Sequence, residues 1–191
     1  MNRLPPLSTA HMSEQQRAMY EEMIASRGAG IINPDGSLQG PFDVMLRSPA
    51  LGDAIQKTGA QVRFESSLTG AQRELAILIC AHYWRANFEW WVHHKVALAE
   101  GIDEATINVI YHGKKPDNAD FAIIDTFLRT LNKTGRVDAE LYAAALELLG
   151  EQAIVELTML SGYYALISQL LNVFEVPLPE GETLPFPEPI V

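Results

Sequence analysis

The sequence predicts an all-α fold of about eight helices in one domain spanning residues 1–191, and three observations carry this prediction. Two segments, Ser13–Gln16 and Thr69–Gln72, have the form of capping boxes that start helices. Strand patterns are nearly absent, because the alternating segment Val173–Val176 is short and ends at a proline. Hydrophobic residues make up 48% of the 191 residues, which suffices for one domain with a substantial core.

The N-terminal third is predicted to hold a long loop between helices. Residues 1–11 carry two adjacent prolines and should be extended, and the first capping box predicts a helix over about 13–26. The segment 27–41 contains four glycines and two prolines, which predicts a loop. Loops of this length within compact domains are often functional. Further helices are expected over about 42–46 and 49–66.

The rest of the chain is predicted to be a succession of helices bounded by capping residues, glycines and turns. The second capping box opens a strongly apolar helix over about 70–83, most of whose circumference should be buried. Most of the later helices start at a capping residue, and they are expected over Asn87–Glu100, Asp103–Tyr111, Asn118–Lys133, Asp138–Leu149 and Glu151–Asn172. The tail 177–191 contains five prolines and should lie extended on the surface or against a neighbouring subunit.

The charge balance excludes some classes of partner. The formal net charge of −10 argues against a general nucleic-acid-binding protein, which normally presents a basic face. An anionic substrate must therefore find positive charge locally. No uninterrupted apolar run approaches the roughly 18–20 residues of a membrane span, and the N-terminus lacks the apolar core of a secretory signal. We therefore expect a soluble cytoplasmic protein without a membrane or nucleic-acid partner.

The cysteine content restricts redox chemistry. Cys80 is the only cysteine, so neither an intrachain disulfide, a dithiol redox motif nor a cysteine-rich zinc site is available. It lies in the apolar segment Leu75–Ala81, where a buried and inert thiol is expected.

The candidate catalytic residues are Glu74, Glu89 and His93. Glu89 and His93 are four residues apart and share one helix face, where a carboxylate can orient an imidazole and raise its pKa. Glu74 lies in an otherwise apolar helix and needs a partner there, because a buried unpaired charge is costly. His93 is a reasonable partner if the two helices form a hairpin. A structural role for the Glu89–His93 pair, on a solvated helix face, remains open.

Around these residues lie all three tryptophans of the chain and several further polar groups. The candidate substrate-binding residues are Arg73, His82, Tyr83, Trp84, Arg85 and Trp90. The aromatic side chains suit either the wall of a small apolar pocket or a plain core, and His82 suits a hydrogen-bonded core position equally well. A metal site is not favoured, because the Glu-x-x-His spacing of di-iron bundles is missing and His93 and His94 cannot face one ion from a regular helix.

The order of several short motifs resembles the carboxymuconolactone decarboxylase family, whose fold is shared with the alkylhydroperoxidase D proteins. The motifs cover most of the chain and include Gly40–Phe42, Arg73–Leu78, Phe88–His93, Ala97–Gly101, Gly135–Val137 and Gly162–Tyr164. The resemblance implies an all-helical fold that assembles into homotrimers or hexamers, with sites near subunit contacts. It also implies that Glu74 and His93 occupy the positions of the family's proton-relay pair.

The resemblance also shows where this chain departs from the peroxidase branch of the family. That branch uses a Cys-x-x-Cys pair, and the aligned positions here are Ala86 and Glu89. Glu89 at the second position is shared with the decarboxylase-like branch. Dithiol peroxide reduction is therefore not expected from this chain.

The function that the resemblance implies is decarboxylation of a small unsaturated lactone without a cofactor. In this mechanism His93 as imidazolium protonates the dienolate, Glu74 or Glu89 orients it, and Arg73 or Arg85 holds the substrate carboxylate. Two alternatives remain open: residual peroxidase-type chemistry without the dithiol, and a non-catalytic oligomeric binding protein.

Overall fold

The computed structural model describes residues 3–187 and confirms the all-α class with eight α-helices in that part of the chain. The helices are α1 (Glu14–Arg27), α2 (Pro41–Met45), α3 (Pro49–Phe64), α4 (Gly70–Trp84), α5 (Asn87–Ala99), α6 (Glu104–Tyr111), α7 (Ala119–Thr134) and α8 (Ala139–Val173). Two short 3-10 helices, Thr9–His11 and Ala29–Ile31, precede α2. Across residues 3–187 the β-structure is one isolated bridge between Ile32 and Leu38.

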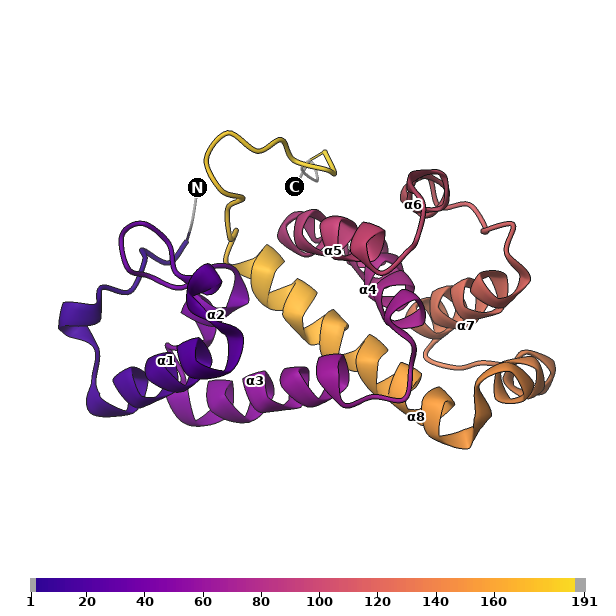
Figure 1. Ribbon diagram of the computed structural model, residues 1–191, viewed down its shortest axis with the longest axis horizontal. Helices are drawn as coiled ribbons and strands as arrows, with labels where there is room; N and C mark the ends of the chain where they lie inside the picture. Colours follow the sequence, from indigo (N-terminus) through magenta and orange to yellow (C-terminus); the bar gives the residue numbers. More distant parts are fainter. Residues whose placement is uncertain (1–2, 188–191) are drawn as a thin grey trace.

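Helix α4 is the centre of the main core. It packs against α5, α7 and α8, and every residue of the segment Glu74–Ala81 is buried. The long helix α8 runs diagonally through the molecule, with α1–α3 on one side and α4–α7 on the other (Figure 1). A second apolar cluster joins α1 to the C-terminal half of α8. The site described below lies where these two halves meet.

Side-chain caps fix most of the helix starts. Both predicted capping boxes are present, with the Ser13 and Thr69 side chains each accepting a backbone N–H three residues later. Asp103, Asn118 and Asp138 cap α6, α7 and α8 in the same way.

One predicted cap is wrong. Asn87 is the first residue of α5 and Ala86 occupies the N-cap position. The Asn87 side chain instead accepts the backbone N–H of Phe186 from the C-terminal tail, at 2.7 Å. A residue type that favours caps therefore serves here to fasten a segment 99 residues away.

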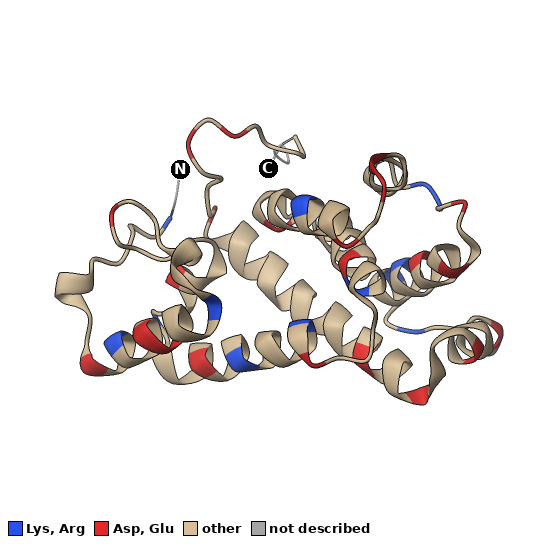
Figure 2. Ribbon diagram, in the orientation of Figure 1, with Lys and Arg blue, Asp and Glu red and all other residues tan. Residues whose placement is uncertain are grey.

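Helix α8 joins the two helices that the sequence predicts on either side of Gly150. That glycine has φ +78° and breaks the helical geometry between them. By length and composition α8 is apolar enough to cross a membrane, a test that core helices of soluble proteins also pass. Its second part carries no charged residue between Leu157 and Phe174, and Figure 2 shows this part of the ribbon in tan. The alternating segment Val173–Val176 ends α8 and forms no strand.

The C-terminal tail does not lie wholly on the surface, which differs from the surface placement predicted from the sequence. Phe186 is fully buried and belongs to the main core, where its ring stacks on Tyr111 at 5.5 Å and meets Trp90 edge-on at 5.2 Å. The Tyr111 hydroxyl donates a hydrogen bond to the carbonyl of Pro185 at 2.7 Å. The tail thus packs on its own chain because an aromatic side chain near its end fills an intramolecular gap. Residues 188–191 of the predicted tail lie outside the described residues.

Candidate functional site

The structure brings Glu74 and His93 into direct contact. The Nδ1 atom of His93 on α5 lies 2.6 Å from Oε2 of Glu74 on α4, and both side chains are buried. The second carboxylate oxygen of Glu74 accepts a hydrogen bond from Nε of Arg73 at 3.4 Å. The partner that a carboxylate in an apolar helix requires is therefore present, as an imidazole on one side and a guanidinium on the other.

The surroundings of this pair keep Glu74 ionised and His93 neutral. Burial raises the pKa of the Glu74 carboxyl, but the hydrogen bond to His93 and the positive charges of Arg63 and Arg73 outweigh it, so the pKa lies below its ordinary value. Burial lowers the pKa of the His93 imidazole, against the opposing effect of Glu74. A neutral His93 that faces a carboxylate through Nδ1 carries its proton there, which leaves Nε2 as the basic atom.

His93 and Glu89 both line a cavity of about 580 Å³ between α1, the loop before α2, α3, α5 and α8. This volume is in the range of small-molecule sites. Six aromatic side chains contribute to its walls: Phe42, Phe64, Phe88, Trp91, Tyr163 and Tyr164. Gly30, Ile31 and Gln39 of the predicted 27–41 loop also line it.

Glu89 is placed differently from the prediction. Its carboxyl group makes no hydrogen bond to His93 in the described part of the chain; Oε2 accepts one from the Ser168 hydroxyl on α8 at 2.7 Å. Its other oxygen, Oε1, is buried and has no hydrogen-bond partner among residues 3–187. Burial raises the pKa of Glu89 to about 8, so this side chain is protonated at neutral pH. The predicted pairing fails because α8 packs against this face of α5 and supplies the closer partner.

The six predicted substrate-binding residues lie outside the lining of this cavity. Arg73 stands behind Glu74 and also contacts Glu100, at 3.5 Å. Three of the six surround Phe186 of the tail: His82, Arg85 and Trp90. Burial lowers the pKa of His82 to about 4, and Arg129 beside it adds to this effect. The other two, Tyr83 and Trp84, meet edge-on at 5.3 Å at the end of α4.

The cations that do line the cavity are Arg27, Arg63 and Lys95, none of which the sequence singled out. Arg27 ends α1 and Arg63 lies in the last turn of α3, far from the conspicuous cluster between Arg73 and His94. Both positions look like ordinary basic residues at helix C-termini, which favour positive charge for local reasons. Only the packing of α1 against α3, and of α3 against α8, places Arg27 and Arg63 at a shared cavity.

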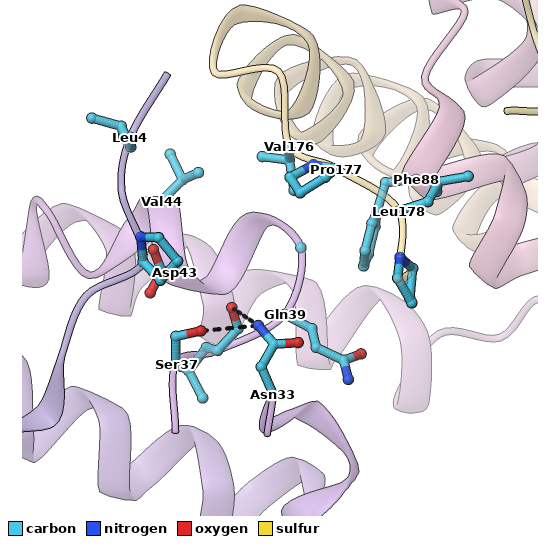
Figure 3. A pocket seen from close by; sticks show the side chains of 14 residues that line it. Leu4, Asn33, Ser37, Gln39, Asp43, Val44, Phe88, Val176, Pro177 and Leu178 are labelled. Atoms are coloured by element: carbon cyan, nitrogen blue, oxygen red, sulfur yellow. Dashed lines mark hydrogen bonds between the residues drawn. The ribbon is translucent and has the colours of Figure 1, made fainter. Parts of the chain in front are cut away.

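A second, smaller hollow of about 110 Å³ lies beside the main cavity and shares Gln39 and Phe88 with it. Figure 3 shows it between the N-terminal segment, the loop after Asn33 and the start of the C-terminal tail. Its acidic residue, Asp43, accepts the backbone N–H of Leu7 at 3.2 Å. No histidine lines this hollow, whereas His93 and Glu89 line the larger cavity.

Comparisons with known proteins support the fold but not a particular activity. No family model matches the sequence, and no curated protein matches it. A solved structure of an uncharacterised peroxidase-related protein from Silicibacter sp. TM1040 matches with a TM-score of 0.72 over 92% of this chain and 91% of the other. The two sequences are 9% identical. The chain therefore has the all-α, alkylhydroperoxidase D-like fold of that peroxidase-related structure.

Proposed function

We propose that this protein is a cofactor-independent lyase of the carboxymuconolactone decarboxylase type, which acts on a small carboxylated lactone or a related unsaturated acid. The observation that carries the proposal is the 2.6 Å contact between buried Glu74 and His93 at a cavity of about 580 Å³. A carboxylate that holds one imidazole nitrogen leaves the other poised for proton transfer to a bound molecule.

The protonation states of the cavity suggest a division of roles. His93 is neutral and basic at Nε2, whereas Glu89 holds its proton until about pH 8. When the carbon–carboxylate bond breaks, CO₂ leaves and the electron pair moves toward the lactone carbonyl. The resulting carbanion then takes a proton from Glu89 or from a transiently protonated His93. This replaces the sequence-based expectation that resting His93 is an imidazolium, because its burial favours the neutral form.

The aromatic walls support binding of a small unsaturated ring. Their faces contact the ring and limit access of water to the carbanion that forms. Phe42, Phe88 and Tyr163 contribute three such walls.

The test is a screen of unsaturated lactones and β-keto acids for CO₂ release by the purified protein. His93→Gln and Glu74→Gln should lower turnover by about 10²–10⁴-fold, the usual contribution of general acid–base catalysis. His94→Gln is the matched control, since His94 is the next residue but pairs with Glu104 outside the cavity. Full activity of the His93→Gln protein would refute the proposal.

Peroxidase-type chemistry is a second candidate, favoured by the likeness to a peroxidase-related structure. The geometry opposes a thiol mechanism, because Cys80 is the only cysteine and is fully buried. If hydroperoxide consumption depends on this chain's own thiol, it must disappear in the Cys80→Ser protein. A third candidate is a non-catalytic oligomeric binding protein, and loss of an activity in the Glu74 and His93 variants in either assay excludes it.

Self-association into a homotrimer or hexamer is part of the same proposal. Exposed apolar side chains on α8 support it: Val155 is 51% exposed and Met159 63% exposed. Such side chains favour burial against another protein surface. Sedimentation equilibrium tests it, and a monomer at all concentrations contradicts it.

A further inference from the structure

Several residues that line the large cavity have buried polar side-chain atoms without a partner in the described part of the chain. Four of the eight buried side-chain polar atoms without a hydrogen bond, among the described residues, belong to its lining: Nε of Arg27, Nε of Arg63, Nε1 of Trp91 and Oε1 of Glu89. Buried polar groups in native proteins are almost always paired, so such a concentration indicates a missing ligand. Three of the four are N–H donors, which require acceptor atoms on that ligand.

Neither arginine has a carboxylate partner among residues 3–187. Arg27 donates from Nη2 to the backbone carbonyl of Gln56 at 2.8 Å and lies over the Phe42 ring at 4.8 Å. Arg63 lies over the Phe64 ring at 5.3 Å. No ion pair to either is found among residues 3–187, although the chain has 24 acidic side chains and only 14 Lys and Arg.

The two guanidinium groups also act on each other and on the catalytic pair. Burial lowers the pKa of Arg27, and the positive charge of Arg63 lowers it further. The charge of Arg63 also lowers the pKa of both Glu74 and His93. Two cations that line one cavity without a carboxylate partner among the described residues favour binding of an anion there.

We infer that the cavity binds a small planar carboxylate, with its carboxylate group held by Arg27 and Arg63 and its ring between the aromatic walls. This inferred carboxylate site rests on the proposed function in one respect, because it names the class of substrate for that activity. Arg63 and His93 line the same cavity, so a ligand whose carboxylate is held at Arg63 shares that space with the imidazole. Arginine suits this task because its planar guanidinium offers paired donors to a carboxylate.

The residues inferred to hold the substrate carboxylate differ from those predicted from the sequence. The sequence singled out Arg73 and Arg85, but Arg73 is bound to Glu74 and Glu100 and Arg85 stacks on Phe186 at 4.4 Å. Both are outside the cavity lining. The positive charge that an anionic substrate needs in a protein of net charge −10 is thus supplied by Arg27 and Arg63.

Calorimetric titration of the full-length protein at low ionic strength tests the inference with three probes: benzoate, benzamide and phenyl phosphate. Benzoate should bind about tenfold or more tightly than benzamide, since the two differ mainly in charge. Equal affinities for benzoate and benzamide overturn the inference. Tighter binding of phenyl phosphate than of benzoate overturns the assignment to carboxylates.

Variants locate the anchor. Arg27→Gln and Arg63→Gln should each weaken benzoate binding about tenfold or more and leave benzamide binding unchanged. Arg136→Gln is the control, because Arg136 is exposed and outside the cavity. Wild-type benzoate affinity in both cavity variants refutes the anchor. If a Gln variant fails to fold, Arg27→Lys and Arg63→Lys replace it, because lysine keeps the charge. Each Lys variant should bind benzoate more weakly than the wild type does. Each should still bind benzoate more tightly than benzamide.

One further variant separates this inference from the proposed function. His93→Gln should lose turnover but keep benzoate affinity, because the anchor does not include the imidazole. Retained turnover in His93→Gln refutes the acid–base role alone. Retained benzoate affinity in the arginine variants refutes the anchor alone.

Discussion

The imidazole of His93 and the carboxylate of Glu74 meet at 2.6 Å across the interface of α5 and α4, in a position closed to solvent on the Glu74 side. The contact joins two helices that follow each other in the chain. The contact is both a catalytic candidate and a structural link between two helices. Turnover measures the first role, and the free energy of unfolding measures the second.

Glu74→Gln should lower the free energy of unfolding by about 1.5–3 kcal/mol at pH 7, the value of a hydrogen bond to a charged group. The folded-state pKa of Glu74 is lowered, so its stabilisation is present above the unfolded value and is lost as pH falls through the folded pKa. Urea unfolding at pH 7, 5 and 3 measures this. A difference between wild type and variant that is the same at pH 3 as at pH 7 contradicts the assignment.

Glu89→Gln should have the opposite pH dependence. The folded-state pKa of Glu89 is raised to about 8, so the stability linked to its neutral form is present below the unfolded value and is lost as pH rises through 8. Glutamine mimics the neutral acid and can still accept from Ser168. The variant should match wild type near pH 5 and exceed it by a few kcal/mol at pH 9.

The control for that experiment is Glu147→Gln, at an exposed position of α8. Its stability relative to wild type should not change between pH 5 and pH 9. A flat profile for Glu89→Gln as well shows that the Glu89 carboxyl is ionised in the folded protein.

Gly59→Ala tests how α3 approaches the cavity. An added Cβ at Gly59 overlaps the hydroxyl and ring of Tyr163, which lines the cavity. Overpacking of this kind costs about 1–3 kcal/mol, against a gain of about 1 kcal/mol in helix propensity. We expect net destabilisation of about 1 kcal/mol. The control Gly162→Ala, at a helical glycine with open space, should stabilise by up to about 1 kcal/mol. Thermal unfolding of both variants tests this expectation. If both variants are more stable than the wild type, α3 does not approach Tyr163 closely at Gly59.

Phe186→Ala should destabilise the fold by about 3–5 kcal/mol, because the ring is fully buried between Trp90 and Tyr111. Leu184→Ala, two residues earlier and 43% exposed, should change stability by no more than about 0.5 kcal/mol. Urea unfolding followed by tryptophan fluorescence reports both. If the two variants are equally stable, the tail does not belong to the folded core.

Cys80 should be inert in the native protein. Burial raises the pKa of its thiol to about 12, so almost no thiolate exists at neutral pH. Labelling with a disulfide reagent such as DTNB should be undetectable in native conditions and complete in urea. Rapid native labelling contradicts the buried environment and reopens thiol-based peroxide chemistry.

Local signals in the sequence accounted for most helix boundaries. A capping side chain acts within three residues, so Ser13, Thr69 and Asp138 could be identified without knowing the fold. The contact between Glu74 and His93 could also be predicted, because a carboxylate in an apolar helix needs a partner and the next helix contains a histidine. Asn87 was misread because its partner, Phe186, is distant in sequence.

What the sequence by itself determined is therefore the helical class, the order of the helices and one buried polar pair, since these depend on short-range periodicity and on the penalty for burying an unpaired charge. The tertiary structure alone decided which side chains share a cavity. Arg27 and Arg63 come from α1 and α3, and nothing in their local sequence marks them, whereas Trp91 on α5 belongs to the aromatic group that the sequence indicates as a possible pocket wall. The place of the two arginines follows from the packing of α1 against α3 and of α3 against α8, which buries the Nε–H of each without an acceptor among the described residues.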